Sequence, residues 1–209
     1  MEKQYRNIGF VFILLIPLAV LGFYKSYIIR SPDVDVIIDG YIHLHAAISS
    51  LWIGLLISQP LLIRYNRYPM HRLLGKISYV IFPLLILSFV PLILRSYNGI
   101  GSVINPVFDV VLLLLFYTLA IRNKRNIAVH MRYMIAITLI FIGPTLARIL
   151  AYWTDVDAFW GSMITWGSIN LILAGLIIWD RSNQRSYRPY QVALSAFFVY
   201  LIAIFLVRY

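Results

Sequence analysis

Residues 51–94 read LWIGLLISQPLLIRYNRYPMHRLLGKISYVIFPLLILSFVPLIL, and this stretch decides the fold class. Two apolar runs flank a basic segment at 64–76. The runs belong to the segments 40–63 and 77–94, which contain no Asp, Glu, Lys or Arg. Because a helix needs about 20 apolar residues to cross a bilayer, the stretch predicts two membrane-spanning helices joined by a basic turn.

The rest of the chain follows the same pattern. Its apolar runs are rich in Leu, Ile and Phe and do not alternate with period two, which argues against a β-barrel. Asp109 lies within one predicted span, and Arg132 and Arg148 lie near the two ends of another. We therefore predict an all-α, polytopic integral membrane bundle with seven transmembrane helices. The predicted spans are 7–24, 40–63, 77–94, 103–121, 131–152, 158–179 and 189–207.

Composition supports this class and excludes others. The 209 residues are 61% hydrophobic and 12% charged, whereas soluble domains carry about 25% charged residues. The chain has no cysteine, which excludes disulfides, a thiolate nucleophile and iron–sulfur clusters. Asp109 is the only carboxylate within a predicted span, which disfavours an intramembrane aspartyl protease. The sequence leaves open whether the protein is an enzyme.

Basic residues orient the bundle. With a cytoplasmic N-terminus, the inner segments hold 13 of the 18 Lys and Arg residues and the outer segments hold 4. This bias satisfies the positive-inside rule and accounts for the net charge of +10 without nucleic acid. We predict an inner (plasma) membrane protein with its N-terminus inside and its C-terminus outside. The lipid bilayer is the expected partner, and membrane-protein partners or a homo-oligomer remain open. The 13 inner residues are Lys3, Arg6, Arg64, Arg67, Arg72, Lys76, Arg122, Lys124, Arg125, Arg132, Arg181, Arg185 and Arg188.

No linker or soluble domain interrupts the pattern, so residues 1–209 are expected to form a single transmembrane domain. The first apolar run has no small-x-small cleavage site after it and is expected to be a retained helix.

Two basic turns resemble each other. The motif IRxxR at 63–67 leads to HR at 71–72, and IRxxR at 121–125 leads to HMR at 130–132. The match needs a one-residue insertion. The two helix pairs are therefore either an internal repeat about an axis along the membrane normal or basic turns that are alike by chance. These pairs are 40–95 and 103–152.

A polar stripe follows one helix. At 100° per residue, His45, Ser49, Trp52, Leu56 and Gln59 share one face of the span 40–63. Polar side chains in a membrane helix are expected to face protein rather than lipid. They either hydrogen-bond neighbouring helices or, in the case of His45, hold a ligand or cofactor.

Two charges lie toward the outer ends of neighbouring spans. Asp109 and Arg148 are expected to pair, because pairing lowers the cost of a charge near the membrane core. Alternatively, Arg148 extends to the outer headgroups. A small-molecule or proton pathway would use an outer polar cluster of such residues. The members of this predicted cluster are His45, Trp52, Gln59, Asp109 and Arg148.

The same residues carry a family resemblance. The series His45, Trp52 and Gln59, then HRLLG at 71–75, then HMRYM at 130–134 and Arg148 resembles a bacterial family of uncharacterised multi-pass membrane proteins, a domain of unknown function. Members carry a His-led helix, an HRxxG turn and an HRxxM-type turn followed by an intramembrane Arg. Here Met131 separates the histidine from the arginine of the last motif.

The histidine-bearing helices are also loosely similar to di-haem transmembrane cytochromes. Those proteins place histidines in four helices as two pairs, whereas the span 103–121 supplies Asp109 and no histidine. The resemblance implies at most one haem.

Our leading hypothesis is one b-type haem near the cytoplasmic face, for electron transfer or redox sensing. His71 and His130 would be its axial ligands, and Arg72 and Arg132 would pair with its propionates. Alternatively, both histidines are ordinary interfacial residues. The protein is then a non-catalytic accessory subunit of a membrane complex, or a pathway through the outer polar cluster.

Overall fold

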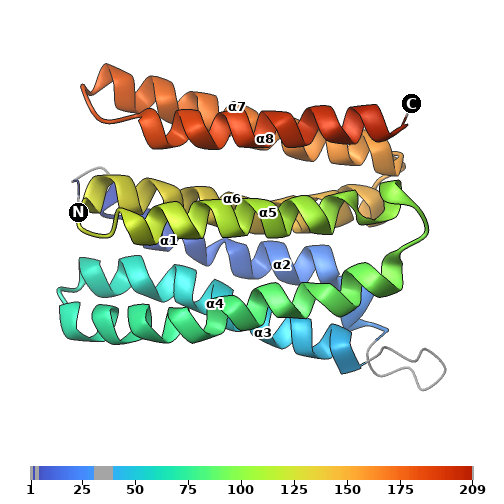
Figure 1. Ribbon diagram of the computed structural model, residues 1–209, viewed down its shortest axis with the longest axis horizontal. Coiled ribbons are helices and arrows are strands. Elements are labelled where there is room, and N and C mark those ends of the chain that lie inside the picture. Colours follow the sequence, from blue (N-terminus) through green and yellow to red (C-terminus); the bar gives the residue numbers. More distant parts are fainter. Residues whose placement is uncertain (1, 3–4, 31–39, 209) are drawn as a thin grey trace. The chain divides into compact units, whose positions relative to one another are not determined.

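The computed structural model describes residues 2, 5–30 and 40–208 (Figure 1). Seven helices in these ranges are long and apolar enough to cross a membrane, and the same ranges contain no strand. The all-α class and the presence of seven long apolar helices are therefore confirmed for the described residues. Lys3, one of the basic residues used to orient the bundle, lies outside the described residues.

The chain divides into two compact units, Met1–Tyr97 and Asn98–Tyr209, and each is described by itself. Unit 1 begins with a span that is broken into short pieces. Pro17 lacks an N–H group and its ring clashes with the carbonyl four residues earlier, at Ile13, which is where α1 ends. The elements of unit 1 are α1 (Ile8–Ile13), α2 (Leu15–Phe23), the π-helical turn η2 (Tyr24–Ile28), α3 (Gly40–Arg64) and α4 (Tyr68–Ser96).

Helices α3 and α4 form a hairpin and run side by side in Figure 1. Helix α4 starts at Tyr68, well before the predicted residue 77. Pro69 occupies its first turn, where the missing N–H costs nothing. The basic residues that follow extend the helix, since their long side chains can reach water from a helix end. His71 and Arg72 therefore lie in the first turns of α4 and not in a loop.

Unit 2 is an antiparallel four-helix bundle in which each helix packs on the next and α8 also contacts α5 and α6. The turns at 123–126 and 183–187 lie at one end, which we call the basic end because of its arginines. The turn at 154–157 lies at the opposite end. Its helices are α5 (Ile100–Arg122), α6 (Ile127–Trp153), α7 (Ala158–Ser182) and α8 (Arg188–Arg208).

Aromatic rings fill the core of unit 2. Phe197 contacts both Phe116 and Trp166, with ring centroids 5.7 and 5.9 Å apart. Gly143 of α6 makes room for this layer. A Cβ atom added at Gly143 would lie 2.3 Å from Cη2 of Trp166, closer than any real contact. The absence of a side chain at Gly143 thus lets α6 and α7 approach each other.

We expect Gly143→Ala to lower the free energy of unfolding by about 1–3 kcal/mol, the usual cost of overpacking a core. Gly175→Ala on α7 is the matched control, because a Cβ added there meets nothing within 4 Å. Thermal unfolding in detergent measures both. Equal melting temperatures for the two variants would mean that the contact with Trp166 does not limit packing.

Candidate functional site

A buried carboxylate lies in the middle of unit 2. Asp109 is the tenth residue of α5, about 14 Å from the start of that helix, and only 6% of it is exposed. The hydroxyl of Tyr200, on α8, forms a hydrogen bond with the Asp109 side chain. The other carboxylate oxygen, Oδ1, is buried and accepts no hydrogen bond from the described residues. The hydrogen-bonding capacity of the Asp109 carboxylate is therefore only partly used.

Acceptors outnumber donors around Tyr200. The Tyr200 hydroxyl lies 3.0 Å from Oδ1 of Asn105 and 3.2 Å from the backbone oxygen of the same residue. It also forms a hydrogen bond with the Asp109 carboxylate. A phenol has one proton to donate. Three acceptors therefore share the one hydroxyl proton of Tyr200, and Oδ1 of Asp109 still lacks a donor among the described residues.

Packing holds the Tyr200 ring in place. Phe108 stacks on it with centroids 4.6 Å apart and planes 6° from parallel. Trp166 contacts the same ring at 4.2 Å, and Tyr200 is completely buried. The position of the hydroxyl is thus set by aromatic contacts from α5 and α7, and its proton is the part that can reorient.

Arg148 of α6 lies in the same region. Its guanidinium donates to the backbone oxygen of Pro144 at 3.0 Å and interacts electrostatically with Asp109 and with Tyr152. Because Oδ1 of Asp109 accepts no hydrogen bond from the described residues, Arg148 does not bind both oxygens of this carboxylate. The structure thus brings together the two charges that we expected to be neighbours, without a two-point ion pair.

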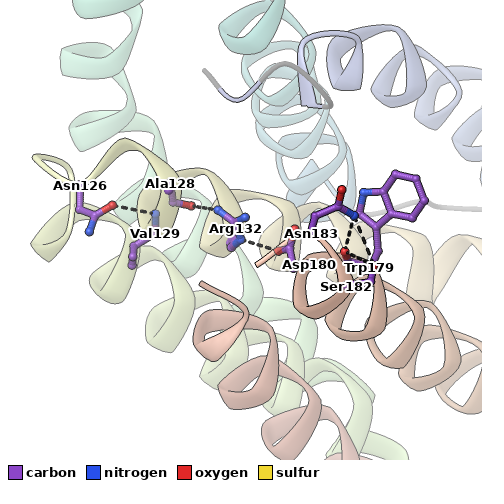
Figure 2. A network of polar contacts seen from close by, with 8 residues as sticks. All are labelled: Asn126, Ala128, Val129, Arg132, Trp179, Asp180, Ser182 and Asn183. Atoms are coloured by element: carbon purple, nitrogen blue, oxygen red, sulfur yellow. Dashed lines mark hydrogen bonds and ion pairs between the residues drawn. The ribbon is translucent and has the colours of Figure 1, made fainter. Parts of the chain in front are cut away.

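A second buried charge pair lies near the basic end (Figure 2). Nε of Arg132, on α6, donates to Oδ2 of Asp180, on α7, at 2.6 Å, and both side chains are 0% exposed. A second guanidinium nitrogen donates to the backbone oxygen of Ala128 at 2.9 Å. The ring of Tyr190, from α8, lies 5.8 Å from the guanidinium carbon. This arrangement ties three helices together.

Asp180 bears on two expectations. Helix α7 extends through Ser182, so Asp109 is not the only carboxylate within a spanning helix. Arg132, which we expected to pair with a haem propionate, has Asp180 as its charge partner. The sequence offered little signal for this pair, since Asp180 precedes Arg181 at a helix end and has the pattern of a solvated interfacial residue.

The helix ends beside this pair are well capped (Figure 2). The Asn126 side chain accepts a hydrogen bond from the backbone of Val129 at the start of α6. Asn183 donates to the backbone oxygen of Trp179 at the end of α7, at 2.8 Å. The Asn126 amide thus binds a backbone N–H that a helix start leaves without a partner, whereas Asn183 adds a side-chain bond to a carbonyl that also accepts from its backbone N–H.

The two predicted haem ligands occupy equivalent positions in sequence. His71 is the fourth residue of α4 and His130 is the fourth residue of α6. Nδ1 of His130 lies 2.9 Å from the backbone oxygen of Ala120 and must donate to it, because a carbonyl only accepts. Neutral His130 then keeps a lone pair on Nε2, as metal-bound histidines commonly do. His71 belongs to unit 1 and His130 to unit 2, so the haem between them stays a prediction. Arg72, the predicted propionate partner beside His71, also belongs to unit 1 and is exposed.

Polar residues of unit 1 form a chain of hydrogen bonds. The Ser88 hydroxyl donates to the backbone oxygen of Leu85 at 2.6 Å, so it accepts from Nδ1 of His45, which lies 2.9 Å away. Nε2 of His45 then accepts from Ser49 at 3.3 Å. His45 therefore links α3 to α4, a role that polar residues often have in membrane helices.

The remaining members of the predicted outer cluster also lie in unit 1. Trp52 is 1% exposed and packs against Phe82 with centroids 5.4 Å apart. Both polar atoms of the Gln59 amide are buried and have no hydrogen-bond partner among the described residues. Of the five predicted residues, unit 2 holds Asp109 and Arg148, and unit 1 holds His45, Trp52 and Gln59.

No family model, curated protein or solved structure matches the chain. The resemblance to a family of multi-pass membrane proteins therefore stays a prediction. Among the described residues, no three or more His, Cys, Asp or Glu side chains are grouped so as to hold a metal ion.

We expect Arg132→Ala to destabilise the protein by about 3–5 kcal/mol, because it leaves the buried Asp180 charge uncompensated. Replacing both partners, as Arg132→Met with Asp180→Leu, should recover much of that loss. Unfolding in detergent measures each variant, with exposed Arg181→Ala as the control. Additive effects of the two single changes would mean that the pair contributes no coupling.

Proposed function

We propose that unit 2 is a proton-exchanging module of a membrane protein and that Asp109 carries the proton. The observation behind this proposal is the surplus of acceptors: one oxygen of a buried carboxylate lacks a donor, while the Tyr200 hydroxyl is shared among three acceptors. A proton on Asp109 supplies the missing donor. Loss of that proton leaves a carboxylate near Arg148, whose charge acts on it.

The cost of burial supports this role. An ionised group without full hydrogen bonding in a low-dielectric interior tends to take up a proton and become neutral, and ionisable residues within membrane spans often form proton relays. Asp180 differs in this respect, since Arg132 donates to it directly at 2.6 Å. Unit 2 thus contains one acid suited to exchange a proton and one suited to stay charged.

An aromatic layer favours proton exchange between Asp109 and the end of unit 2 that lies opposite the basic end. Between Asp109 and the basic end lie Phe116, Tyr133 and Phe197, all buried and in contact through ring pairs. These side chains fill the core between Asp109 and the basic end with aromatic rings. Proton exchange from the opposite end, past Arg148 and Tyr152, fits both a proton-coupled transporter and an accessory subunit of a membrane complex. The haem hypothesis is a separate prediction that no contact within either unit tests.

Hydrophobic carbodiimides modify carboxyl groups that are protonated in an apolar setting, and they test this proposal. We expect modification of Asp109 that declines as the pH rises. Peptide mass spectrometry of the protein in lipid nanodiscs locates and quantifies the label. Asp180 is the internal control, because it is also buried but is ion-paired, and we expect it to remain unlabelled.

Two outcomes would contradict the proposal. One is equal labelling of Asp109 and Asp180, and the other is labelling of Asp109 that does not change with pH. Asp155 and Asp157, in the exposed turn at the opposite end, lie outside an apolar setting and are expected to remain unlabelled by the hydrophobic reagent. Asp109→Asn should abolish the label at position 109.

We further propose that the N-terminus lies inside an inner membrane and the C-terminus outside, as the distribution of Lys and Arg favours. Reporter fusions after residues 67, 124 and 185 are then expected to give cytoplasmic signals. These positions lie in or beside the turns that follow α3, α5 and α7. A periplasmic signal from any of them would overturn the orientation.

A further inference from the structure

A groove lies on the surface of unit 2 between α5 and α8. It is a shallow depression of about 470 Å³ that is open along most of its length. Its apolar walls are formed chiefly by side chains that are exposed in this unit, including Leu115, Val192 and Val199. Two polar side chains, Gln191 and Ser195, also line it.

The groove runs away from the basic end. Its α8 residues extend from Gln191 to Val199, and Leu115 faces them from α5. At 1.5 Å per residue, Leu115 lies about 10 Å and Val199 about 16 Å from the arginines that begin and end these helices. Half of a bilayer's hydrocarbon core is about 15 Å thick. The groove therefore matches the depth of one leaflet.

One arginine from each helix stands at the basic end of the groove. Arg188, Val192, Ser195 and Val199 follow one another at helical spacings of four, three and four residues and share a face of α8. Arg122 is seven residues beyond Leu115 and shares its face of α5. Both arginines are exposed, and both lie at the basic end because α5 ends there and α8 starts there.

Within unit 2, the turns beside these two arginines carry no acid. The turns at 123–126 and 183–187 contain no Asp or Glu, and the nearest carboxylate in the sequence, Asp180, is bound to Arg132. The basic end therefore presents positive charge directly beside an apolar groove of acyl-chain depth. An amphiphile with an anionic head and a hydrocarbon tail matches both parts.

We propose that this groove binds an anionic phospholipid, with its phosphate between Arg122 and Arg188 and one acyl chain along Leu115, Ser195 and Val199. The phosphate accepts hydrogen bonds from the two guanidinium groups. The acyl chain covers apolar side chains of α5 and α8. This inference does not depend on the proton at Asp109.

Native mass spectrometry of the delipidated full-length protein tests the site. The added lipids are phosphatidylglycerol, which is anionic, and phosphatidylcholine, which is zwitterionic. We expect tighter binding of phosphatidylglycerol. Arg122→Gln with Arg188→Gln should weaken its binding by about 25-fold, since each basic residue near anionic lipid contributes about fivefold. Arg181→Gln, at the same end but on α7, is the matched control and should change binding less than twofold.

Further variants distinguish the contribution of the lipid headgroup to binding from that of the acyl chain, and they include a check on folding. Arg122→Lys with Arg188→Lys keeps the charge and should retain the preference for phosphatidylglycerol. Ser195→Trp fills the groove and should weaken binding of both lipids, with the melting temperature as a check on folding.

Three outcomes would overturn the proposal. They are equal affinity for the two lipids, a double glutamine variant that behaves like Arg181→Gln, and full displacement of phosphatidylglycerol by inorganic phosphate. The last result would show a site for free phosphate rather than for a lipid.

Discussion

The Arg132–Asp180 ion pair is the interaction on which unit 2 most depends. Both side chains are completely buried, and a buried charge must find its partners within the protein. Arg132 of α6 binds Asp180 of α7 directly and lies against Tyr190 of α8. One side chain thus fixes three of the four helices at the basic end. The caps at Asn126 and Asn183 hold the adjoining helix ends in register with it.

Helix α6 carries a second arginine, and its hydrogen-bonding partners differ from those of Arg132. Arg148 lies 16 residues after Arg132 on α6, about 24 Å along the axis. It acts on Asp109 without satisfying both carboxylate oxygens, and Asp109 shares the single Tyr200 proton with Asn105. Unit 2 therefore combines a fully compensated acid, suited to hold the bundle together, with an incompletely compensated acid, suited to gain and lose a proton.

Local patterns predicted the spans well because hydropathy is a property of consecutive residues. The ends of the spans were harder to predict, since counting uncharged residues stops at the first Lys or Arg. Helix α4 instead continues through Arg72 and Lys76 to Tyr68. Pro17 broke the first span for a reason that is visible in the sequence, although we had predicted one continuous helix there.

The site depends on contacts that local patterns cannot reveal. Asp180 lies 48 residues from Arg132, and Tyr200 lies 95 residues from Asn105, so neither partnership follows from periodicity. The pairing of Asp109 with Arg148 was easier to anticipate, because α5 and α6 are joined by a short turn. The grouping of His45 with these charges had no such basis, and His45 lies with Ser49 and Ser88 in unit 1.

Infrared difference spectroscopy between acidic and alkaline pH tests the central claim most directly, because it observes the carboxyl group itself. If Asp109 exchanges a proton, the spectra of the protein in lipid contain the carbonyl stretch of a protonated carboxylic acid that disappears at alkaline pH. That band should be absent from Asp109→Asn and unchanged when the exposed Asp155 is replaced by Asn. A spectrum without such a band, or a band that persists in Asp109→Asn, would contradict the account.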